Sequence, residues 1–186
     1  KYFMASAYRI IFVNEASSRI GMGHILRSLV LVQKMLSLGC KVFGITVGDE
    51  KAVAYAQKKA KESGFNWPVF ICSEVGVAIR EISKNNPHIV VVDCNFLNKD
   101  FVLACADLAI PVVALDYFHG SQPLPNAIIN LIDHNEDTLI GTPPKRIGSK
   151  YLEGPDYGLI RDEFLIARKN TINKIISTSI RNILIA

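Results

Sequence analysis

A histidine flanked by glycines is the feature of this sequence that most clearly suggests chemistry: Gly21 and Gly23 precede His24. Imidazole titrates near neutral pH, so a positioned histidine can take a proton from a nucleophile. Arg27 and Ser28 follow His24 at i+3 and i+4, which places all three on one face of a helix. The glycines suggest a backbone that takes a positive φ or approaches another group closely. We therefore expect a functional site here.

The elements on either side of His24 are those that commonly position a reacting group. Residues 8–13 are β-branched and aromatic, which predicts a buried strand. After His24 the apolar residues Ile25, Leu29 and Val32 recur at helical spacing, which predicts a helix over residues 24–38 that ends at Gly39. At a turn between strand and helix, backbone N–H groups and the helix dipole attract anions.

Named phosphate-binding signatures fit this segment poorly. A dinucleotide fingerprint would need glycine at position 26, where Leu26 stands, and no Walker loop is present. A nucleotidylyltransferase pair is matched in part, by the Gly-His of residues 23–24 and by a faint second motif at residues 175–181. This class of enzyme stays open as an alternative.

Composition indicates a folded globular protein. The chain has 186 residues, of which 49% are hydrophobic and 20% charged, and its formal net charge is +4. This size suits one ordinary domain with room for an appendage, and the mild positive charge argues against a dedicated nucleic-acid binder. The four cysteines form no CxxC pair, and no apolar run is long enough to cross a membrane. With no signal peptide visible, we expect a cytoplasmic protein with free thiols.

Strand and helix patterns alternate along most of the chain. Strands are predicted at residues 8–13, 41–47, 68–72, 88–93, 111–115 and 127–132, and helices at 24–38, 50–63, 75–86 and 98–108. Near-continuous apolar strands between helices predict an α/β fold with a doubly wound, mainly parallel sheet and helices on both faces. Residues 133–157 are rich in turn formers and predict an irregular connection, followed by a helix over 158–170.

Polar side chains follow the predicted strands. Asn14, Asp49, Asp93 and Asp116 stand at or just beyond strand ends, and residues 133–135 follow the last of these strands. In an open parallel sheet all these ends meet at one edge, where ligands bind. We expect a ligand site at this edge, close to His24. The spacing of its acidic residues and histidines matches no metal motif.

Two segments of the chain resemble one known family. Residues 17–29 resemble the opening of the UDP-sugar hydrolases of pseudaminic acid biosynthesis and of the related spore-coat polysaccharide glycosyltransferase-like proteins. Residues 154–164 are similar to the second block of that family, and Asp93 and Asp116 fall where its strands end in aspartates. The resemblance covers nearly the whole chain and corresponds to the family's N-terminal domain.

The resemblance implies a two-domain glycosyltransferase B fold with its active site between the domains. Residues 1–170 would form the Rossmann-like N-terminal domain. Residues 171–186 would form a linker helix and the first strand of a C-terminal domain that binds UDP. The implied function is hydrolysis or transfer of a sugar from a UDP-sugar, and this chain alone would be inactive.

The resemblance also implies roles for single residues. His24 matches the family's proposed general base, which takes a proton from the nucleophile while the nucleotide leaves with inversion. We expect the substrate to be bound by Gly21, Gly23, Arg27, Asp93, Asn95, Asp116 and Tyr157, with no metal or cofactor.

Two questions stay open at this point. The nucleophile is either water or a sugar hydroxyl. Asn95 stands where the hydrolases of the family tend to carry a tyrosine, which favours the spore-coat-like branch. The same departure leaves a non-catalytic sugar-binding domain as an alternative.

Overall fold

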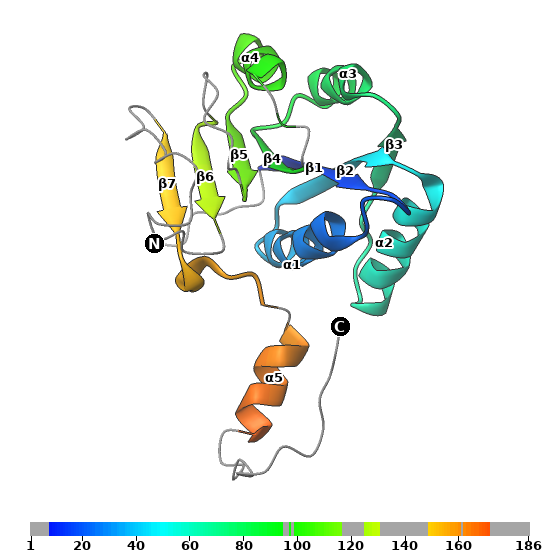
Figure 1. The fold of residues 1–186 in the computed structure, drawn as a ribbon, viewed down its shortest axis with the longest axis vertical. Helices are drawn as coiled ribbons and strands as arrows, with labels where there is room; N and C mark the ends of the chain where they lie inside the picture. The colour runs from blue at the N-terminus through cyan, green and yellow to red at the C-terminus, as the bar shows by residue number, and fades with distance from the viewer. Residues whose placement is uncertain are drawn as a thin grey trace.

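The computed structural model describes residues 8–94, 97, 99–116, 125–130, 149–160 and 162–171. A seven-stranded sheet forms the centre of this part of the chain, and every neighbouring pair of its strands is parallel (Figure 1). The strands are β1 (Arg9–Ala16), β2 (Lys41–Gly48), β3 (Val69–Cys72), β4 (Ile89–Asp93), β5 (Val112–Leu115), β6 (Ala127–Asn130) and β7 (Lys150–Glu153). Their order in the sheet is β3-β2-β1-β4-β5-β6-β7.

Helices cover both faces of this sheet, which confirms the predicted doubly wound α/β fold. They are α1 (Gly23–Ser37), α2 (Glu50–Glu62), α3 (Val75–Asn85), α4 (Lys99–Asp107) and α5 (Asp162–Thr171), with a short 3₁₀ turn, η3 (Pro155–Tyr157). Helices α1 and α2 lie on one face, and α3 and α4 on the other (Figure 1). The chain builds outward from β1 to β3, then returns to place β4 on the other side of β1. The sheet therefore has a topological switch point between β1 and β4.

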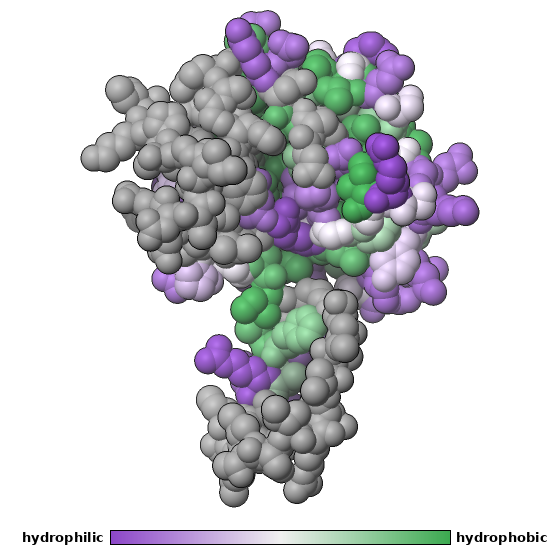
Figure 2. All heavy atoms as spheres, viewed as in Figure 1, coloured by the Kyte–Doolittle hydropathy of each residue, from purple (hydrophilic) through white to green (hydrophobic). Residues whose placement is uncertain are grey.

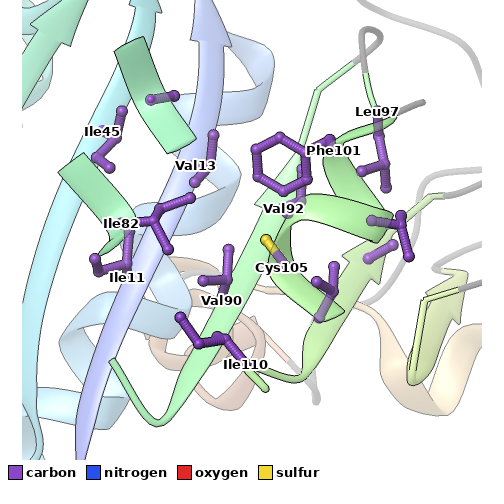
Figure 3. Close-up of a cluster of buried hydrophobic side chains, with 14 of the residues drawn as sticks. Ile11, Val13, Ile45, Ile82, Val90, Val92, Leu97, Phe101, Cys105 and Ile110 are labelled. Atoms are coloured by element: carbon purple, nitrogen blue, oxygen red, sulfur yellow. The ribbon is translucent and has the colours of Figure 1, made fainter. Parts of the chain in front are cut away.

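Two apolar layers hold the helices on the sheet. Figure 3 shows the layer under α3 and α4, where Ile82 lies beside Ile11 of β1 and Phe101 beside Val92 of β4; all four are at most 2% exposed. On the other face, the predicted helical stripe of α1 is buried together with Trp67 of the segment before β3. Gly44 makes room for this tryptophan, since a Cβ there would lie 2.8 Å from the indole ring. The second layer fixes the body of α1, the helix that carries His24, against the sheet.

The structure corrects the predictions for the C-terminal third. Part of the predicted irregular connection, residues 150–153, forms β7, which pairs with β6. This strand has no continuous apolar run because it lies at the sheet edge and is only partly buried, so its sequence carries a weak signal. The helix predicted from residue 158 begins at Asp162, and Tyr157 lies in η3 instead of at a helix start. Thr171, where the proposed C-terminal segment begins, is the last residue of α5, and residues 172–186 with the last predicted strand lie outside the described residues.

Helix α5 stands away from the sheet, at the end of the segment that follows β7 (Figure 1). Apolar side chains gather on this helix and on the segment leading to it (Figure 2), and Ile160 and Ile166 are 50% and 59% exposed. No helix of the described residues has the length and apolar character needed to cross a membrane.

Candidate active site

His24 and Asp93 meet at the switch point of the sheet. His24 lies in the first turn of α1, directly after the loop that leaves β1, and Asp93 is the last residue of the neighbouring strand β4. His24 Nδ1 is 2.6 Å from Asp93 Oδ1. The carboxylate is 1% exposed and the imidazole side chain 22% exposed. The buried group thus orients a histidine that keeps access to solvent.

Arg27 joins the pair from one helical turn further on. Its Nε donates to Asp93 Oδ2 at 2.8 Å, and its terminal nitrogens donate to Asp93 Oδ1 and to Asp116 Oδ2. Asp116 follows β5 and takes a positive φ of 48°, a conformation that aspartate tolerates better than most residues. Burial disfavours the charged guanidinium, but the hydrogen bonds and charges of Asp93 and Asp116 outweigh it and raise the pKa of Arg27. Arg27 is therefore a permanent cation at this site.

The contact with Asp93 decides which ring nitrogen of His24 faces away from the buried carboxylate. With Nδ1–H donating to Asp93, the neutral ring carries its lone pair on Nε2. Arg27 bonds both carboxylates, Asp93 and Asp116. A buried carboxylate that holds an imidazole through Nδ1 is an arrangement that general-base histidines can use.

The glycines of the motif differ in what they do. Gly21 has a φ of 92°, as expected for a glycine required by the backbone, and its N–H donates to Ser17 O at 2.8 Å. Gly23 has no positive φ, and a Cβ there would meet no atom within 4 Å. The start of α1 also lacks a side-chain cap and has no acidic residue in its first turn. Beside His24 the backbone of α1 is therefore open to an approaching group.

The other residues predicted at this edge or in the site differ in where the structure places them. Asn14 lies at the predicted edge, but its fully buried side chain accepts a hydrogen bond from Ser28 at 2.5 Å and pins α1 to β1. Tyr157 is 39% exposed and lies in η3, after β7. Asn95 lies outside the described residues, as do residues 133–135.

Sequence reasoning missed a second polar network at the same edge of the sheet. Asn130, at the end of β6, donates to the hydroxyl of Tyr151 at 2.7 Å, and this hydroxyl donates to Glu153 at 3.2 Å. The signal for this network is weak because Tyr151 and Glu153 belong to β7, which the sequence did not predict.

The cysteines and acidic groups give no sign of a metal centre in the described part of the chain. No group of three or more histidine, cysteine, aspartate or glutamate side chains there could hold a metal ion. All four cysteines are free thiols, and three of them are buried, as expected. Burial raises the pKa of Cys72, and that of Cys105 to about 11, so neither is a reactive thiolate near neutral pH.

Comparison with known proteins finds a similar protein, but that protein has no assigned function. No protein-family model matches the chain. It is similar to the uncharacterized protein MJ1062 of Methanocaldococcus jannaschii, with 24% identity over an alignment that covers 96% of this chain. The chain spans only 36% of the length of this relative.

Proposed function

We propose that this chain is the N-terminal catalytic half of a UDP-sugar-processing enzyme, with His24 as its general base. The reaction is hydrolysis or transfer of the sugar at its anomeric carbon. It would serve surface or spore-coat polysaccharide or nonulosonic acid biosynthesis. The hydrogen bond between His24 and the buried Asp93 at the switch point carries this proposal. The family resemblance of residues 17–29 and 154–164 supplies the substrate class.

In the proposed reaction, His24 acts on the nucleophile and not on the nucleotide. Water or a sugar hydroxyl attacks the anomeric carbon and gives its proton to Nε2 of His24. The bond from that carbon to the phosphate oxygen breaks, and UDP leaves with the electron pair. Attack from the face opposite the leaving group inverts the anomeric centre.

Asp93 and Arg27 prepare His24 for this step. Asp93 holds the ring through Nδ1 and stabilises the imidazolium once it forms. Arg27 fixes both oxygens of Asp93 and carries a second link to Asp116, so the carboxylate cannot turn away from the ring. The open backbone at Gly23 gives a sugar room beside His24. The additional length of the archaeal relative is consistent with a further domain that holds UDP.

The test is a UDP-release assay on the full-length protein with a panel of UDP-sugars. His24→Gln removes the base, and we expect the rate to fall about 10²- to 10⁴-fold, as when a general base is lost. His88→Gln is the matched control, because His88 lies before β4 at the opposite edge and bonds the backbone N–H of Arg9 at 3.0 Å. The control should retain the wild-type rate.

Three other outcomes would contradict the proposal. Wild-type rates in folded His24→Gln would remove His24 as the base. Binding of UDP-sugars without turnover by the wild-type protein would favour a sugar-binding domain. Release of pyrophosphate from ATP or CTP would indicate a nucleotidylyltransferase.

A further inference from the structure

The loop that leads from β1 to His24 is closed by its own hydrogen bonds. Gly21 N–H donates to Ser17 O at 2.8 Å, and Ile20 N–H donates to Ser17 Oγ at 3.1 Å. Ser17 and Gly21 also form an isolated antiparallel bridge. Residues 17–21 therefore move as one unit, and the orientation of this unit sets where α1 begins.

A side chain just beyond the neighbouring strand β2 bonds this loop. Asp49 follows β2, and its Oδ1 accepts the N–H of Ala52 at 2.9 Å, which caps α2. Its Oδ2 accepts the N–H of Ser18 at 2.9 Å, within the loop. An N-cap needs only one acceptor oxygen. The second oxygen of Asp49 thus links the start of α2 to the loop before His24.

The backbone around Asp49 makes this link short and rigid. The N–H of Asp49 donates to Ala16 O, at the end of β1, at 3.3 Å. A Cβ on Gly48 would lie 1.7 Å from the same Ala16 oxygen, so only glycine allows the two strand ends to approach this closely. The backbone hydrogen bonds from Ser18 and Ala52 lower the pKa of Asp49, so the carboxylate remains ionised under neutral conditions.

The first turn of α1 depends on such outside support. Its N-cap residue is Met22, which offers no side-chain oxygen to the helix. In this turn the side chain of His24 bonds Asp93 of β4, and one turn further on Arg27 bonds Asp93 and Asp116. A shift of the loop would therefore turn the imidazole relative to Asp93.

We infer that Asp49 is a positioning residue for His24: it holds the loop of residues 17–21 against the start of α2 and so fixes the imidazole on Asp93. This inference rests on the proposed role of His24 as a base. Asp49 touches no reacting atom, and its effect on the rate passes through the loop.

The test compares Asp49→Ser with Asp49→Ala in the full-length protein. Serine keeps one oxygen to cap α2 but offers no second acceptor to Ser18, whereas alanine removes both bonds. Glu62→Gln, at the other end of α2, is the control for loss of a carboxylate. Hydrogen exchange read by mass spectrometry follows the peptides of the loop and of the α2 start separately, and NMR follows the ring signals of His24.

In Asp49→Ser we expect faster exchange in residues 17–22, unchanged exchange at the start of α2, and shifted His24 ring signals. We also expect kcat for UDP release to fall about 10-fold with KM within twofold, because a small displacement of a catalytic group mainly affects the transition state. Asp49→Ala should show the same kcat with added exchange in α2, and Glu62→Gln should match wild type.

Unchanged kcat, or unchanged loop exchange and ring signals, in Asp49→Ser would overturn the inference. If the wild-type protein released UDP from no UDP-sugar, the proposed function would fail on its own. The exchange and ring signals need no substrate, so they would still decide whether Asp49 positions His24.

Discussion

Asp93→Asn is the sharpest perturbation of the proposed active site, because it changes charge without changing size. Asp93 is 1% exposed, and its Oδ1 lies 2.6 Å from His24 Nδ1 and also accepts from a terminal nitrogen of Arg27, while its Oδ2 accepts from Arg27 Nε at 2.8 Å. An asparagine can place its oxygen at only one of these two positions. Its amide nitrogen then faces the donor or donors at the other position, and the negative charge that stabilises the imidazolium is lost.

The size of the effect follows from these contacts. A hydrogen bond to a charged group contributes about 1.5–3 kcal/mol. If this stabilisation acts on the imidazolium in the transition state, kcat falls about 10- to 160-fold, at 1.36 kcal/mol for each factor of ten. Arg27 keeps its contact with Asp116, so no buried cation is left unpaired. We therefore expect the free energy of unfolding to fall by only about 1–3 kcal/mol.

The assay measures UDP release under saturating UDP-sugar, with urea unfolding as a parallel check on stability. Asp116→Asn is the control, because Asp116 contacts Arg27 and its loss leaves the bond between His24 and Asp93 in place. We expect kcat in this control to fall less than in Asp93→Asn. A folded Asp93→Asn protein with kcat within twofold of wild type would refute the reasoning, as would equal losses in the two variants.

Two further predictions concern the helix start and a buried thiol. Gly23→Ala adds a methyl group that meets no atom within 4 Å. In urea titrations the free energy of unfolding should therefore stay level or rise by up to about 1 kcal/mol. The rate of UDP release should fall if a sugar occupies the space beside Gly23. An unchanged rate would show that no sugar occupies that space. Burial raises the pKa of Cys105 from 9.0 to about 11, so its contribution to stability is complete below pH 9 and is lost as pH rises toward 11. Between pH 8 and pH 10.5 the wild-type protein should lose on the order of 2 kcal/mol more unfolding free energy than Cys105→Ala, and equal losses would contradict this.

Local patterns were sufficient for most of the fold. The apolar run of residues 89–92, within the strand predicted at 88–93, and the helical stripe after His24 located β4 and α1 to within one residue. Buried parallel strands and amphipathic helices are encoded by residues close together in the sequence. The failure at β7 has the opposite cause. Residues 150–153 are partly buried at a sheet edge, and pairing with β6, not their own pattern, makes them a strand.

The sequence by itself determined that His24 stands at the start of a helix, behind a strand and a glycine turn. It also determined that aspartates follow the strands of a parallel sheet. Only the tertiary structure decided which of them His24 meets. Asp93 is 69 residues away and Asp116 lies 89 residues from Arg27, and these distances close because β4 returns to the side of β1. Strand order and register arise from packing of the whole sheet, so no local pattern contains them.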